Sequence, residues 1–180
     1  MARKLPRFLT PEEVAAMISV CENKRDQMLL KCMYFLGLRN SEVQKLQIED
    51  IDLLNKTVKI VQSKGKKDRY VPIPPGFIKE LKEWIGNRKG PLFPGNSNGF
   101  ISDRHIRRIV KKYAKLANVR KYEEIHPHTL RHSYATHLQN QGVPLNVIQE
   151  LLGHSRIETT TVYLHLGLDR MRKYIEKAFK

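Results

Sequence analysis

The segment HPHTLRHSYATHL, residues 126–138, is the most distinctive stretch of the sequence. The pattern from His128 to about Gln141 predicts a helix that ends at Gly142. His128 and Arg131 are three residues apart, so they share one face of that helix. A histidine and an arginine that project together from a helix start suit an anion, because the helix N-terminus adds a partial positive charge. Taken alone, the pair is more typical of a solvated basic face.

A metal site is a second interpretation of this stretch. His128 and His132 are four residues apart, a spacing that two ligands on one helix can use. No carboxylate or cysteine stands at a supporting spacing, and a zinc site needs three or four protein ligands. We therefore expect no metal here.

Downstream of this stretch, two more helices are predicted, with single polar residues between them. Pro144 to about Leu152 is helical and ends at Gly153, and residues 170–179 form a last amphipathic helix. His154 follows the glycine, where a histidine is usually a simple helix cap. Tyr163 follows a run of threonines and, by itself, indicates half-buried packing.

Upstream, three helices are predicted before residue 50. Thr10 caps the first, the second follows Asp26 and ends at Gly37, and the third is a short helix with its cap at Ser41. Arg39 lies between the second and third helices. An arginine at such a place is more often a surface residue.

The middle of the chain changes period and predicts a small sheet. Residues 57–62 and 69–73 read as two strands joined by a hairpin turn that contains Lys64, and Pro72 makes the second strand an edge. A helix over about 75–86 and a loop over 87–101 follow. Ser102 then caps a basic helix that reaches about residue 117, so the predicted class is mainly α with a small antiparallel sheet (α+β).

Charge is the strongest compositional signal. The 180 residues contain 33 Lys+Arg and 18 Asp+Glu, so 33 − 18 leaves a net charge of +15. Such a surplus repels itself unless the partner is a polyanion. The length suits one domain, and no apolar run approaches a membrane span. The two cysteines indicate buried free thiols in a reducing cytoplasm.

Five separated motifs turn these ordinary features into one pattern. They are GLRNSE (37–42), SKGKKDRYVPIP (63–74), HPHTLRHSYATHL (126–138), LLGH (151–154) and TTTVYLHL (159–166). In order and spacing they resemble the catalytic domain of the tyrosine recombinases, the phage-integrase and Xer group. The resemblance covers the chain from residue 10 onward and implies the fold of that domain.

The resemblance also implies six catalytic residues and their roles. Tyr163 attacks a DNA phosphodiester and forms a 3′-phosphotyrosine bond, and Arg39, Arg131 and His154 hold the phosphate oxygens. Lys64 protonates the departing 5′-oxygen, and His128 accepts a proton from Tyr163 or orients it. A free phenol has a pKa of about 10, so such help is needed at neutral pH.

These cations take the place that two metal ions occupy in most nucleases. We expect no cofactor, no metal and activity in the presence of a chelator. The covalent bond conserves the phosphodiester energy, so rejoining needs no ATP.

Further basic residues are candidates for contacts with double-stranded DNA. On the helix after Ser102, several cations are four residues apart and repel each other unless phosphates lie between them. A solvated face is the plain alternative; on a chain of charge +15, a DNA-tracking face is at least as well supported. The candidates are Lys66, Lys67, Arg69, Arg104, Arg107, Arg108, Lys111 and Lys112.

The resemblance also bears on domain organisation. Family members usually carry a helical DNA-clamping domain ahead of the catalytic one. Residues 1–9 are predicted to be a basic arm or interdomain linker and residues 10–180 the catalytic domain, with the clamp domain absent. By its apolar residues alone, the helix 170–179 folds onto its own core. The family resemblance implies the alternative, a tetramer on DNA in which this helix docks on a neighbouring subunit.

The predicted function is therefore site-specific recombination of DNA by a cytoplasmic, nucleoid-associated enzyme, of the integration or dimer-resolution type. Relaxation of DNA in the manner of a type IB topoisomerase is one alternative. A non-catalytic DNA-binding regulator is another, although an intact Tyr163 and both arginines argue against it. A metal-dependent nuclease fails for want of ligands.

Overall fold

The computed structural model describes residues 7–61, 68–95, 99–153 and 161–179, with only the backbone course for 161–167 and 169. The chain divides into two compact units. Unit 1 comprises residues up to 44 together with 93–137, and unit 2 comprises 45–92 together with 138–180. The division falls within one helix, after His137.

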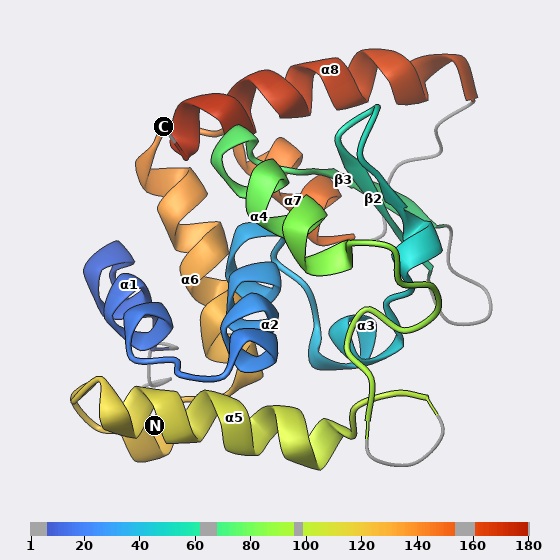
Figure 1. Cartoon of the computed structure of the whole chain (residues 1–180). Helices are drawn as coiled ribbons and strands as arrows, with labels where there is room; N and C mark the ends of the chain where they lie inside the picture. Colours follow the sequence, from blue (N-terminus) through green and yellow to red (C-terminus); the bar gives the residue numbers. More distant parts are fainter. Residues whose placement is uncertain (1–6, 62–67, 96–98, 154–160, 180) are drawn as a thin grey trace. The chain divides into compact units, whose positions relative to one another are not determined.

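Unit 1 is built from helices (Figure 1). They are α1 (Pro11–Ser19), α2 (Lys24–Phe35), α3 (Asn40–Lys45), α5 (Asp103–Leu116) and the first part of α6 (Pro127–Asn140), with a 3-10 turn at Tyr122–Glu124. Helix α1 contacts both α2 and α5. The core of this unit includes Leu29, Met33, Ile106, Tyr113 and Tyr134, each almost fully buried.

Local chemistry explains where these helices begin. Thr10 caps α1 as predicted, because its hydroxyl accepts from the Glu13 N–H and the Glu13 carboxylate accepts from the Thr10 N–H. Helix α2 was predicted to follow Asp26, but it begins at Lys24, two residues before Asp26. Its cap is Asn23, whose side-chain oxygen accepts from the Asp26 N–H at 3.2 Å.

Gly37 ends α2 for two physical reasons. Its φ of +58° lies in the left-handed region, which favours glycine. A Cβ at this position would also lie 2.5 Å from the ring of Tyr134. The glycine therefore lets α6 approach the turn that leads to Arg39.

Unit 2 contains the sheet, with strand order β1-β2-β3 and antiparallel pairing. The strands are β1 (Ile51–Asp52), β2 (Thr57–Ile60) and β3 (Arg69–Pro72). Val58 pairs with Val71, and β3 is an edge strand, as Pro72 predicts. The two-residue β1 is too short to leave a period in the sequence and was not predicted.

The helices of unit 2 are α4 (Pro75–Ile85), α7 (Leu145–Leu152) and α8 (Thr161–Ala178), and a 3-10 turn spans Ile48–Asp50. Both α7 and α8 contact β3. Helix α8 begins before the predicted residue 170. The prediction missed this part because it includes Thr161 and Gly167, which are poor helix formers. No helix in the described part of the chain is both long and apolar enough to cross a bilayer.

Candidate active site and nucleic-acid interface

Arg39 is held at the start of α3 by its own neighbours. Its carbonyl accepts the first helical hydrogen bonds, from the N–H groups of Glu42 and Val43 at 3.0 Å each. The Glu42 carboxylate in turn accepts from the Arg39 N–H at 2.7 Å and from the Arg39 guanidinium at 2.7 Å. With this R-x-x-E spacing, the Glu42 carboxylate both caps the start of the helix and holds the Arg39 side chain in place.

Arg131 reaches the same place from α6. It is 7% exposed, and its Nη1 donates to the Gly37 carbonyl at 2.6 Å. The same nitrogen lies 3.6 Å from the Glu42 carboxylate. The structure thus brings both predicted phosphate-binding arginines to one carboxylate within unit 1.

The shared carboxylate makes this arrangement possible. Two guanidinium groups in low-dielectric surroundings repel each other, and Glu42 offsets part of that repulsion. The Arg39 side chain stays 29% exposed while the Glu42 side chain is only 8% exposed. An anion that approaches from solvent would therefore meet a cation already held in place, with a second one behind it.

Glu42 is the residue of this cluster that the sequence analysis did not single out. It entered there only as part of the GLRNSE motif and of a short-helix start. The signal that could have found it is an acidic residue three positions after an arginine at a helix start, where its carboxylate can reach the arginine's own N–H.

His128 lies at the start of α6, three residues before Arg131, and its side chain is exposed. Its ring stands edge-on to that of His126, with centroids 6.1 Å apart. Burial, the charge of His128 and the charge of Arg107 all lower the pKa of His126. Positive potential therefore gathers at the beginning of α6.

The other predicted catalytic residues are described less fully. Tyr163 lies in the first turn of α8. Lys64 and His154, like the DNA-contact candidates Lys66 and Lys67, lie outside the described residues.

Arg69 differs from its prediction. It is 8% exposed, and its Nε donates to the Leu151 carbonyl at 2.8 Å. The guanidinium therefore ties β3 to the end of α7 within unit 2 rather than lying on the surface as a DNA contact would. The buried Leu151 carbonyl needs a hydrogen-bond donor, and the sequence around Arg69 does not show that Arg69 supplies it.

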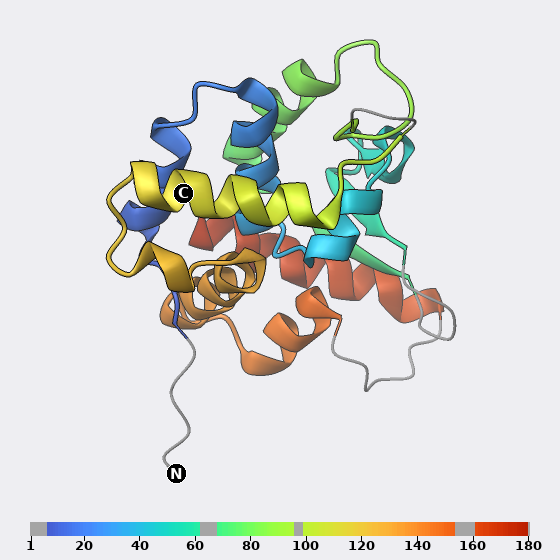
Figure 2. The same ribbon diagram turned by 90° about the horizontal axis from the view of Figure 1, so that it is seen from below.

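Helix α5, drawn in yellow in Figure 2, carries the predicted basic residues. Ser102 caps it by accepting from the His105 N–H at 3.2 Å. Its apolar side buries Ile106, Ile109, Val110 and Tyr113. The exposed residues of the helix are Arg104, Arg107, Arg108, Lys111, Lys112, Lys115 and Leu116.

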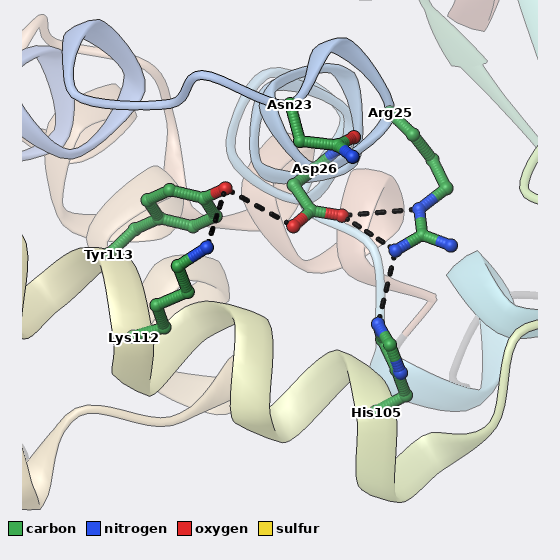
Figure 3. A network of polar contacts seen from close by, with 6 residues as sticks. All are labelled: Asn23, Arg25, Asp26, His105, Lys112 and Tyr113. Atoms are coloured by element: carbon green, nitrogen blue, oxygen red, sulfur yellow. Dashed lines mark hydrogen bonds and ion pairs between the residues drawn. The ribbon is translucent and has the colours of Figure 1, made fainter.

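The buried carboxylate of Asp26 links the start of α2 to α5 through hydrogen bonds (Figure 3). Asp26 is 6% exposed and accepts from Arg25 at 2.9 and 3.1 Å and from the Tyr113 hydroxyl at 3.2 Å. Burial first, and then the charge of Asp26, raises the pKa of Tyr113. The phenol therefore stays protonated and keeps donating.

Arg25 extends this contact to His105, with the two nitrogens 3.1 Å apart. Burial first, and then the charge of Arg25, lowers the pKa of His105. A neutral His105 can accept from Arg25. On the neighbouring turn, the Lys112 ammonium lies 4.8 Å from the centre of the Tyr113 ring.

Metal ligands are not gathered in the described ranges. There, no three histidine, cysteine, aspartate or glutamate side chains lie close enough to form a metal site. The thiols are Cys32, which is buried, and Cys21, which is half-buried. Burial raises the pKa of Cys21 to about 11.

The sequence model described as the phage integrase family matches residues 7–169. A tyrosine recombinase of Pseudothermotoga lettingae is 43% identical over 91% of this chain and 58% of its own length. Tyrosine recombinase XerC of Thermodesulfovibrio yellowstonii is 40% identical over 98% of this chain and 63% of its own length. The chain therefore spans about three fifths of the length of these relatives.

Solved structures agree with this match. An integrase from mycobacterium phage Brujita superposes with a TM-score of 0.84 at 25% identity, covering 100% of this chain and 61% of that one. The XerA recombinase does so with a TM-score of 0.77 at 26% identity, covering 95% and 65%. XerH recombinase bound to its difH substrate gives 0.73 at 28% identity, covering 92% and 54%. These likenesses confirm the predicted fold class.

Proposed function

Because this chain belongs to the phage integrase family, we propose that it cuts and rejoins DNA at specific sites through a 3′-phosphotyrosine intermediate. The observation that carries this proposal is the pair Arg39 and Arg131, held by Glu42 at one place in unit 1. The same chain presents Tyr163 in the first turn of α8.

The proposed reaction is a transesterification. The Tyr163 oxygen forms a bond to phosphorus, and the bond from phosphorus to the 5′-oxygen breaks. His128 receives or directs the phenol proton, Lys64 supplies a proton to the departing 5′-oxygen, and His154 donates to a phosphate oxygen. In the reverse step, a 5′-hydroxyl attacks the phosphotyrosine and releases Tyr163.

The arginine pair supplies the electrostatic part of the catalysis. Negative charge grows on the non-bridging phosphate oxygens as the tyrosine attacks. A donor that is already in place stabilises this charge without reorganisation, and losing one such donor raises the barrier by roughly 3–4 kcal/mol. The contacts of Arg39 and Arg131 with Glu42 and Gly37 are the kind of support that holds donors in place.

We propose double-stranded DNA as the partner and the cytoplasm, at the nucleoid, as the place of action. The exposed cations of α5 and the net charge of +15 support this proposal. The solved XerH structure, by its description, holds its difH substrate. Integration and dimer resolution remain two versions of the same proposed chemistry.

We also propose self-association on DNA as a tetramer. In the single chain, α8 contacts β3 of its own unit and buries Met171, Ile175 and Ala178. The Arg172 side chain donates to the Asn55 carbonyl at 2.9 Å. Exchange of the tail 170–179 between subunits, the alternative, would require these contacts to open.

A trapping experiment tests the chemistry. Supercoiled plasmid is mixed with the protein in EDTA, the mixture is denatured rapidly and digested, and Tyr163 is examined by mass spectrometry. A nucleotide adduct on Tyr163 supports the proposal. Tyr163→Phe should abolish the adduct, whereas Tyr174→Phe, on the same helix, should keep it. Loss of the adduct only in a metal-free buffer would contradict the proposal.

The products separate recombination from its alternatives. Relaxed plasmid with no joined products, even from two copies of a suspected native site, would favour the topoisomerase-like activity. DNA binding with no adduct on a pre-nicked duplex of that site would favour the non-catalytic regulator.

A further inference from the structure

A buried amide lies directly after Arg39. Asn40 is 6% exposed, and its Nδ2 donates to the carboxylate of Asp103, which is the first residue of α5. Its Oδ1 is buried, and no group in the described part of the chain is a hydrogen-bond partner for it.

This amide is a poor choice for stability alone. A buried acceptor without a donor loses its hydration and gains no bond in return. Leu38 and Val43, two residues before and three residues after Asn40, are apolar and fully buried. An apolar side chain at position 40 would avoid the cost, so the contribution of Asn40 lies in its directional bond to Asp103.

Asp103 uses its other oxygen for a second partner. Its Oδ2 accepts from the Nε of Arg107, one turn further along α5, at 2.7 Å. The Arg107 side chain is 61% exposed. One carboxylate therefore joins the residue after Arg39 to an exposed cation of the basic helix.

Arg107 also acts electrostatically on the beginning of α6. Its charge contributes to the lowered pKa of His126, after burial and the charge of His128. The ring centroids of His126 and His128 are 6.1 Å apart, and His128 is three residues before Arg131. Arg107 is therefore part of the same positive region as the arginine pair, rather than of a remote stretch of the helix.

We propose that Asp103 is a positioning residue, which locks the Arg39 turn to Arg107 so that one DNA backbone meets the arginine pair and Arg107 together. The inference rests on the proposed DNA cleavage. In this arrangement Arg107 binds a phosphate beside the one that is cut. Asn40 transmits its position to Arg39 through the backbone, and neither Asn40 nor Asp103 touches the reacting atoms.

The second anchor of α5 makes this proposal testable. Asp26 holds the C-terminal part of the helix through Tyr113, independently of Asp103 (Figure 3). Loss of the Asp103 contact should therefore loosen the Arg39 turn without releasing the helix from unit 1.

The first test compares Asn40→Leu with Ser41→Ala, an exposed neighbour in the same helix. The readouts are the adduct rate on supercoiled plasmid at saturating protein, affinity for a labelled duplex of random sequence, and Tm. For Asn40→Leu we expect an adduct rate lower by about ten- to a hundredfold, with unchanged duplex affinity and a Tm no lower than the parent's. Ser41→Ala should match the parent. A parental adduct rate in Asn40→Leu, or a loss matched by a fall in Tm, would overturn the proposal.

The second test separates position from charge at Asp103. Asp103→Asn keeps an oxygen for Asn40 and should retain most of the adduct rate, whereas Asp103→Ala should resemble Asn40→Leu. Equal losses in both variants would overturn the proposal. Arg107→Gln should weaken duplex affinity and reduce the salt dependence by about one phosphate contact. Unchanged affinity would overturn the role of Arg107.

A third readout does not depend on cleavage. Amide hydrogen exchange should be faster over residues 38–45 in Asn40→Leu than in the parent, with the protection over 106–114 unchanged. If the parent forms no adduct, the proposed function fails while this readout still stands. Parental exchange in the variant would overturn the positioning role even if cleavage is real.

Discussion

Two arginines of this protein are almost equally buried and serve different purposes. Arg131 in unit 1 is 7% exposed, and Arg69 in unit 2 is 8% exposed. Each donates to a distant carbonyl, Arg131 to Gly37 and Arg69 to Leu151. Arg131 in addition lies beside the carboxylate that holds Arg39, whose side chain is 29% exposed, so its charge adds to a cluster that reaches solvent.

The comparison shows that two equally buried arginines can have different surroundings. A second cation, a shared carboxylate and partial exposure distinguish the group around Arg131. Arg69 lies within a lysine-rich motif, and the motif suggested a DNA contact. Its Nε bond to Leu151 instead assigns it to the packing of β3 against α7.

Arg131→Lys should produce the largest effect. Lysine keeps the charge but loses the planar fork that can serve Gly37 and a phosphate at once. We expect the rate of adduct formation on Tyr163 to fall by about 10²–10³ at saturating DNA. Single-turnover trapping measures the rate, and an unchanged duplex affinity serves as the control. A parental rate would remove Arg131 from the phosphate site.

Glu42→Gln should have the next largest effect. The amide preserves shape but leaves two guanidinium groups without their shared negative charge, which should lower the free energy of unfolding by about 1.5–3 kcal/mol. Denaturant unfolding measures the loss, and the adduct rate should fall with it. Glu83→Gln, at an exposed position of α4, is the matched control and should leave both quantities unchanged.

Arg69→Met tests the other side of the comparison. Removal of the bond to Leu151 should cost about 1–3 kcal/mol of stability and leave the salt dependence of DNA binding unchanged. Arg108→Gln, on the exposed face of α5, should do the reverse and reduce the salt slope by about one. A reduced salt slope in Arg69→Met would restore the original prediction of a DNA contact.

The smallest effect concerns Arg25, whose partner His105 can titrate. The pKa of His105 is below its ordinary value of 6.5 in the folded chain. The unfolded chain therefore binds more protons between that lowered pKa and 6.5, so stability is full above pH 6.5 and falls as the pH drops through this window. His105→Gln keeps an acceptor for Arg25 and should reduce this acid loss in thermal unfolding. His126 should retain part of the loss, because its pKa is lowered too.

Much of the secondary structure could be predicted because its causes are local. The Thr10 cap, the Gly37 stop and the Ser102 cap depend on residues within one turn, and all three are observed. The helical period of α5 likewise separates its apolar side from its basic face. The start of α2 was misplaced because Asn23 and Asp26 are both good caps, and local spacing does not choose between them.

The sequence could name candidate residues for the site, but not the groups that hold their side chains in place. The motifs name Arg39, His128, Arg131 and Tyr163 through a resemblance, without their contacts. Glu42, the Gly37 carbonyl and the Asn40–Asp103 bond each acquire a role only when α3, α5 and α6 come together. Neither the periodicity nor the composition of the sequence indicates these tertiary contacts.

By itself, then, the sequence determined the positive charge, the helix limits set by caps and glycines, and the order of the motifs. Tertiary structure alone decided which buried arginine lies beside a carboxylate that a second, partly exposed arginine shares. The contact of Arg131 with Gly37 joins residues 94 apart, and that of Arg69 with Leu151 joins residues 82 apart. Propensities and caps act within a turn, whereas the demand of a buried carbonyl or carboxylate for a donor arises only once packing excludes water.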